Sequence, residues 1–164
     1  MRRTLPRSFA ACIVRQTDIR PAVRRACREE RRVPVHRHQN PPTIHAPRGY
    51  SHVVEATGPG RTVYIAGQVG MAPDGKIAPD FRAQVTQCFE NLKAALAAAG
   101  VGFEHVVKTT NYFIDIGQIP VFREVRDRYI DTKAPPASTA VQVGKLAAPD
   151  YLFEIEAIAV VPEK

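Results

Sequence analysis

The sequence has few of the residues from which metal and redox sites are built. Its 164 residues include no tryptophan and three cysteines, Cys12, Cys27 and Cys88, whose spacing matches no metal-binding or redox motif. A disulfide framework is therefore not expected, and a reducing compartment, the cytoplasm, is the default prediction. His36 and His38 could ligate a metal, but no further ligands stand at a suitable spacing. We predict two solvated histidines and no metal site.

Long apolar runs are also absent. No run approaches the roughly 20 residues that a helix needs to span a bilayer. The longest apolar piece of the N-terminal segment, residues 9–14, is too short for the centre of a secretory signal, which needs about 7–15 residues. We therefore expect neither a membrane-spanning helix nor a secretory signal.

Positive charge is confined to one end of the chain. Residues 1–48 hold 12 of the 23 Lys+Arg and 3 of the 16 Asp+Glu, a balance of +9. Residues 49–164 hold the remaining 11 basic and 13 acidic residues, a balance of −2. The larger part of the chain is thus close to neutral, and no phosphate-binding surface or nucleic-acid partner is expected for it.

The same division suggests one folded domain behind an extension. Residues 1–45 are rich in arginine and proline, with scattered apolar positions, a composition that favours disorder. We expect either a disordered tail or an extension translated from a misplaced start codon. Residues 46–164 are long enough for one domain with a sizeable core.

The pattern after residue 50 predicts alternating strands and helices. Short β-branched runs predict strands at residues 53–56, 62–69 and 105–114, and apolar spacings of three and four predict helices at 81–99 and 120–130. Asp80 and Gly100 are placed to begin and end the first helix. With closing C-terminal strands the order is β-β-α-β-α-β-β, an α+β sheet with both helices on one face. The other face needs a cover, for which a partner subunit is the economical answer.

The last strand, predicted at residues 151–161, carries two carboxylates. Apolar and polar positions alternate along it, and Glu154 and Glu156 share one face. A buried carboxylate needs water, a partner or a ligand. Two interpretations stay open, a wet rim of the sheet or a ligand site.

Two further side-chain roles follow from helical spacing. Cys88 flanks the apolar stripe of the first helix, so we predict a packing residue and not a nucleophile. In the second helix, Arg123 with Asp127 and Glu124 with Arg128 are opposite charges four residues apart, which predicts two surface ion pairs.

Several motifs in order resemble the RidA family, also called YjgF. They are PRGYSHVV, YIAGQV, FRAQVTQCFENLKAALAAAG, VVKTT and finally PPASTAVQVGKL followed by FEIEAIAV, which together cover about residues 44–161. The resemblance implies a chorismate-mutase-like fold and a homotrimer with a pocket in each cleft between subunits. It also implies hydrolysis of reactive enamine and imine acids to a 2-keto acid and ammonia, without a cofactor.

The resemblance assigns roles position by position. Tyr50 stands at the position of a cleft-lining tyrosine, Ala66 and Gly67 at a cleft-lining backbone segment, and Glu154 at a water-positioning glutamate. The arginine that anchors the substrate carboxylate is replaced by Ser138, which Thr139 follows, and a frequent cysteine is replaced by Ala140. Arg123 takes the place of an asparagine in the second helix. All eight positions are candidate site residues, with Glu154 as the catalytic candidate and the others as substrate-binding candidates.

The loss of the family's arginine is the main departure from the pattern. Serine cannot form a charged clamp, and losing a charge-assisted hydrogen bond costs roughly 1.5–3 kcal/mol, or about ten- to a hundredfold in affinity. The chain therefore resembles an arginine-lacking branch of the family. Arg123 either turns inward as a new anion anchor or forms the surface pair with Asp127.

Three functions compete at this point. The first is a cofactor-independent hydrolase that deaminates an enamine or imine through a non-standard recognition residue. The second is a non-catalytic trimer that binds a small metabolite in the same clefts or acts through protein contacts. The third is the ribonuclease activity attributed to parts of the family, which the near-neutral domain and the lack of a basic and aromatic stripe disfavour.

Overall fold

The computed structural model describes residues 34–163, which form one four-stranded sheet, one two-stranded sheet and two α-helices. The elements in order are β1 (Val35–Gln39), β2 (Val53–Thr57), β3 (Arg61–Val69), α3 (Phe81–Ala98), β4 (Val106–Phe113), α4 (Ile119–Arg126), β5 (Ala137–Gln142) and β6 (Phe153–Val161). Short 3-10 helices precede β4 and α4, at Phe103–His105 and Ile116–Gln118.

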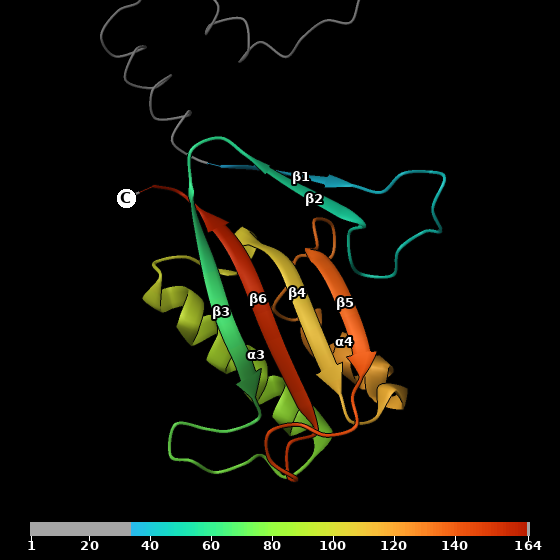
Figure 1. Cartoon of the computed structure of the whole chain (residues 1–164), viewed down its shortest axis with the longest axis vertical. Coiled ribbons are helices and arrows are strands. Elements are labelled where there is room, and N and C mark those ends of the chain that lie inside the picture. The colour runs from blue at the N-terminus through green and yellow to red at the C-terminus, as the bar shows by residue number, and fades with distance from the viewer. Residues whose placement is uncertain (1–33, 164) are drawn as a thin grey trace, which may run out of the picture.

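The larger sheet has the strand order β3-β6-β4-β5. β6 pairs antiparallel with both β3 and β4, whereas β5 pairs parallel with β4 and forms one edge. Both helices lie on the same face of this sheet, and β1 and β2 form a separate ribbon beyond one end of it (Figure 1). The predicted α+β class and one-sided helix layer are therefore confirmed.

β6 shows why this arrangement is stable. Its odd-numbered residues, such as Phe153 and Ile155, are buried under the helices, while its even-numbered residues, such as Glu154 and Glu156, are only partly buried. This strict alternation is what a strand requires when one face packs on a core and the other does not. The predicted strand was two residues too long at its start.

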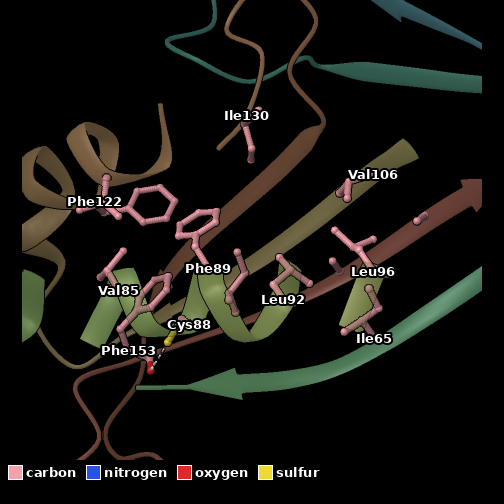
Figure 2. Packing of buried hydrophobic residues seen from close by; sticks show 14 of the residues in the cluster. Ile65, Val85, Cys88, Phe89, Leu92, Leu96, Val106, Phe122, Ile130 and Phe153 are labelled. Atoms are coloured by element: carbon pink, nitrogen blue, oxygen red, sulfur yellow. Dashed lines mark hydrogen bonds between the residues drawn. The ribbon is translucent and has the colours of Figure 1, made fainter. Parts of the chain in front are cut away.

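The core lies between the sheet and the helices, and aromatic rings fill much of it (Figure 2). Phe113 and Phe153 meet edge to face at 5.0 Å between ring centroids, and Phe89 stacks on Tyr129 at 4.9 Å. Cys88 is fully buried beside them, with its Sγ 3.8 Å from the Phe153 carbonyl oxygen. Burial raises the pKa of the Cys88 thiol, and the charge of Glu154 adds to this. Cys88 therefore has the packing position that the sequence predicted.

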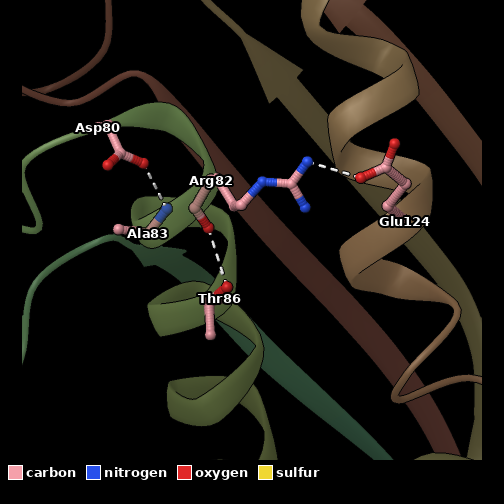
Figure 3. A network of polar contacts seen from close by, with 5 residues as sticks. All are labelled: Asp80, Arg82, Ala83, Thr86 and Glu124. Atoms are coloured by element: carbon pink, nitrogen blue, oxygen red, sulfur yellow. Dashed lines mark hydrogen bonds and ion pairs between the residues drawn. The ribbon is translucent and has the colours of Figure 1, made fainter.

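Local polar contacts fix α3 and join it to α4. The Asp80 carboxylate accepts a hydrogen bond of 2.9 Å from the Ala83 N–H, which caps the helix start (Figure 3). Beyond the other end, Gly100 has a φ of +79°, the left-handed conformation that favours glycine. Arg82 pairs with Glu124 of α4 at 2.6 Å (Figure 3). The predicted Glu124–Arg128 pair is therefore wrong, because Arg82 from the neighbouring helix takes that carboxylate.

The ordered region begins earlier than the sequence predicted. β1 pairs antiparallel with β2 along its whole length. His36 Nε2 lies 3.1 Å from the Val160 carbonyl oxygen, and His38 Nδ1 lies 3.0 Å from that of Pro135. The expectation of solvated histidines in a disordered segment is thus wrong for residues 34–45, because both rings find partners in the C-terminal half of the chain. Residues 1–33, with Cys12 and Cys27, lie outside the described residues.

The sheet face opposite the helices carries no further layer within residues 34–163. Tyr64 of β3 is 78% exposed there, and Val141 of β5 is also exposed. Among the helices of this part of the chain, none is long and apolar enough to cross a membrane.

Candidate functional site

A cavity of about 200 Å³ lies between the edge strand β5, helix α4 and the loop before β2. It is lined by Arg48, Tyr50, Ile119, Phe122, Arg123, Arg126, Ser138 and Ala140. Four of the residues predicted from the sequence therefore come together here, namely Tyr50, Arg123, Ser138 and Ala140. We call this space the β5-edge cavity.

Ser138 is held rigidly in the wall of this cavity. Its Oγ accepts two hydrogen bonds, one of 3.1 Å from the Thr109 hydroxyl and one of 3.0 Å from the Asn111 side-chain amide. The same amide donates to the Thr139 carbonyl oxygen at 2.8 Å, so Asn111 fixes two consecutive residues of β5. With both lone pairs of the Ser138 oxygen engaged, its hydroxyl hydrogen is free to donate to a ligand.

The loop that carries Tyr50 is fastened to the start of β5. The Ser51 N–H donates to the Pro136 carbonyl oxygen at 3.1 Å, and the Ser51 hydroxyl donates to that of Pro135 at 2.7 Å. The Tyr50 hydroxyl lies 2.9 Å from His45 Nε2. These contacts fasten the loop on which Tyr50 lines the cavity.

Arg126 forms the floor of the cavity and is already neutralised. It is only 7% exposed, and its Nε and Nη2 bond Asp127 Oδ1 at 2.8 and 2.6 Å. The guanidinium also lies 5.7 Å from the centre of the Phe122 ring, a cation–π contact. Gly49 packs directly on it with a φ of +77°, and a Cβ there would collide with the guanidinium.

Arg123 is the half-buried cation of the cavity wall. Because Asp127 is taken by Arg126, the predicted Arg123–Asp127 surface pair does not form. Within residues 34–163 no carboxylate lies within ion-pair distance of the Arg123 guanidinium, and that group makes no hydrogen bond. Arg123 is therefore free to meet an anion in the cavity that it lines.

The other predicted site residues lie elsewhere. Glu154 projects from the face of β6 opposite the helices, and its carboxylate rests on Gly67, where a Cβ would collide with it. Gly67 lies in a bulge of β3, where the pairing with β6 shifts between Ile65 and Gln68. Glu154 is thus not in the wall of the β5-edge cavity of its own chain, and the predicted site is divided into two groups.

Ala66 and Thr139 also face away from the β5-edge cavity. Ala66 lines a shallow hollow of about 410 Å³ on the open sheet face, together with Lys108 and Glu156. The Thr139 hydroxyl accepts a hydrogen bond of 2.5 Å from the Lys108 ammonium. Burial lowers the pKa of Lys108, although the neighbouring Glu156 carboxylate opposes this. Glu156 in turn accepts a hydrogen bond of 3.2 Å from the Tyr112 hydroxyl.

Sequence reasoning missed several residues that build the cavity. Arg48 and Arg126 add two guanidiniums, and Asn111 positions Ser138. Arg48 stands two residues before Tyr50 in the motif PRGY, so its closeness to the predicted tyrosine could have been noticed. Arg126 lies among several other charged residues of the second helix, and nothing in the sequence distinguishes it from them. In the part of the chain that the structure describes, no group of three His, Cys, Asp or Glu side chains is placed to hold a metal.

The fold agrees with comparisons to known proteins. The sequence profile of the Endoribonuclease L-PSP family matches residues 42–161. The chain belongs to this family, and the resemblance to RidA proteins is confirmed.

Several individual proteins are similar to this chain over most of their length. The RutC family protein YjgH of Escherichia coli is 36% identical over 123 residues, which cover 74% of this chain and 90% of YjgH. The 2-iminobutanoate/2-iminopropanoate deaminase of Rattus norvegicus is 38% identical over 120 residues, or 72% of this chain and 86% of the enzyme. The crystal structure of the Rid family protein YyfB from Yersinia pestis superposes with a TM-score of 0.70 at 33% identity, covering 77% of this chain and 98% of that one.

Proposed function

We propose that this protein hydrolyses a small enamine or imine acid to the keto acid and ammonia, without a cofactor. The observation that carries this proposal is the free guanidinium of Arg123 in the cavity where Ser138 replaces the usual arginine. A deaminase named for 2-imino acids among the relatives supports the reaction class.

Recognition rests on Arg123 and Ser138 together. Arg123 binds the substrate carboxylate from α4, and the free hydrogen of the Ser138 hydroxyl adds a neutral donor from β5. A charge-assisted hydrogen bond contributes about 1.5–3 kcal/mol, so the relocated cation supplies about what the family's arginine would. The substrate carboxylate then approaches from α4 and not from β5, where the family's arginine would stand. The cavity still binds an anion, but the substrate lies in it in a different orientation.

The reaction needs a water molecule and a base, and Glu154 is the candidate. Water attacks the imine carbon and gives one proton to the Glu154 carboxylate, which passes it to the nitrogen. The resulting carbinolamine collapses as its hydroxyl proton moves to nitrogen, the C–N bond breaks and the C=O bond forms. One imine and one water thus give one keto acid and one ammonia.

Glu154 reaches the substrate only if a second copy of the chain supplies it. Within one chain it lies on the opposite side of the sheet from the β5-edge cavity. The uncovered sheet face, with Tyr64 78% exposed, offers a surface on which another copy can pack. We therefore propose a homotrimer in which the cavity of one chain meets Gly67 and Glu154 of the next.

A non-catalytic metabolite-binding trimer is the second candidate. It is favoured by the replacement of the family's arginine with Ser138 and by the absence of a carboxylate from the cavity wall in the single chain. In that case the cavity binds keto or imino acids without turnover.

Ammonia release separates the two candidates. Freshly generated 2-iminopropanoate is mixed with the full chain, with Glu154→Gln, and with Glu163→Gln as a surface control near the C-terminus. The proposal expects faster release with wild type and the control, and a loss of about 10²–10⁴-fold in Glu154→Gln. Binding of pyruvate without any acceleration by wild type would favour the non-catalytic protein.

A further inference from the structure

The β5-edge cavity holds more positive charge than one carboxylate requires. Three of its eight lining residues are arginines, and none is acidic. Asp127 neutralises Arg126 from behind, whereas Arg48 and Arg123 form no ion pair with any carboxylate of residues 34–163. Two uncompensated guanidiniums therefore line one small space.

The two free arginines approach the cavity from different elements. Arg123 lies on α4, whereas Arg48 lies on the loop that Ser51 fastens to the start of β5. Gly49, between Arg48 and Tyr50, packs on the buried guanidinium of Arg126 and so ties this loop to α4. The two cations thus stand on separately anchored segments of backbone, which suits a ligand with two separated anionic groups.

Size limits what such a ligand can be. A cavity of about 200 Å³ corresponds to about seven water volumes at roughly 30 Å³ each. It is smaller than the roughly 300 Å³ at which pockets for drug-sized ligands begin. A metabolite of four or five carbons fits this space in the single chain. Ile119 and Phe122 supply an apolar wall for the carbon chain.

We propose that the β5-edge cavity selects dianionic substrates, namely the imines or enamines of short amino dicarboxylic acids. This inference rests on the proposed function and names its substrate class. Arg123 binds the carboxylate next to the imine carbon, and Arg48 binds the second carboxylate at the far end of the chain. Arg48 is thus a specificity-determining residue that touches only the distal group.

The test uses two stable keto acids that differ only at that end. 2-Oxoglutarate and 2-oxopentanoate have the same chain length, but the first ends in a carboxylate and the second in a methyl group. Each is titrated by calorimetry into the full wild-type chain, Arg48→Ala, Arg48→Lys and Arg128→Ala. Arg128 is an exposed arginine just beyond α4 that does not line the cavity, so its variant controls for net charge.

The expected result is that wild type binds 2-oxoglutarate at least about tenfold more tightly than 2-oxopentanoate, the size of one charge-assisted contact. Arg48→Ala lowers the affinity for 2-oxoglutarate much more than the affinity for 2-oxopentanoate and so removes this preference. Arg48→Lys keeps part of it, and Arg128→Ala behaves as wild type. Equal affinities in wild type, or a preference that survives in Arg48→Ala, would overturn the dianion inference while leaving the deaminase proposal intact. Failure of wild type to bind either acid would overturn both.

Discussion

Replacing Arg126 by methionine is expected to weaken ligand binding by Arg123, although Arg123 itself is not mutated. Asp127 is bound to Arg126 Nε and Nη2, and its side chain is 43% exposed. Once Arg126 is removed, Asp127 keeps its charge in contact with water and lies four residues after Arg123 on the same helical surface. The pair predicted from the sequence, and absent from the structure, then becomes available.

The magnitude follows from the exposure of the new pair. A partly exposed ion pair contributes about 0.5–1 kcal/mol, so a carboxylate ligand competing for Arg123 loses about two- to fivefold in affinity. Stability falls by about 1–2 kcal/mol, because a buried, charge-assisted hydrogen bond is lost while the methionine keeps the packing under Gly49. Urea unfolding measures the second effect, and titration of 2-oxobutanoate measures the first.

The double variant Arg126→Met with Asp127→Asn is the matched control. It removes both charges of the buried pair, so no carboxylate is left to capture Arg123. Ligand affinity is expected to return to the wild-type value even though the stability loss remains. If Arg126→Met alone binds 2-oxobutanoate as wild type does, or if the double variant fails to recover, the reasoning about Arg123 and Asp127 is wrong.

Three further predictions follow from particular contacts. Gly67→Ala should displace the Glu154 carboxylate and lower the rate of ammonia release by about 10²-fold or more. Stability in urea should change little, since a flexible side-chain end yields to the new methyl group. Turnover at the wild-type rate would show that Gly67 does not position the catalytic carboxylate. The pKa of His36 is lowered from its ordinary 6.5, mainly by burial, so the folded chain binds fewer protons than the unfolded one. The contribution of neutral His36 to the free energy of unfolding is therefore present above pH 6.5 and is lost as the pH falls below that value. The urea midpoint should drop more steeply on acidification in wild type than in His36→Gln. A chain that begins at residue 34 should form the proposed trimer in light scattering, because the open sheet face with Tyr64 is unchanged; a stable monomer would contradict the proposed assembly.

Much of the fold was predictable because local patterns and tertiary packing agree. The alternation in β6 and the three- and four-residue spacing in α3 each specify one buried face, and the structure buries that face. The bounds of α3 were predicted to within one residue, since Asp80 and Gly100 have distinct chemistry at its ends.

The parts that were missed depend on long-range partners. β1 looks like an unstructured basic segment because His36 and His38 meet their partners, Val160 and Pro135, 124 and 97 residues away. Both predicted surface pairs of α4 were wrong because spacing along one helix does not reveal Arg82 on another helix or the burial of Arg126. The sequence left two interpretations open for Arg123, an anion anchor that turns inward or a surface pair with Asp127. Spacing along the helix could not show that Asp127 pairs with Arg126 instead.

The affinity of Arg123→Ala for a carboxylate tests the central claim most directly. 2-Oxobutanoate is titrated into wild type, Arg123→Ala and Arg128→Ala, with light scattering to show that assembly is unchanged. A relocated anion anchor predicts a loss of about ten- to a hundredfold in Arg123→Ala alone. Equal affinity in all three proteins would contradict it.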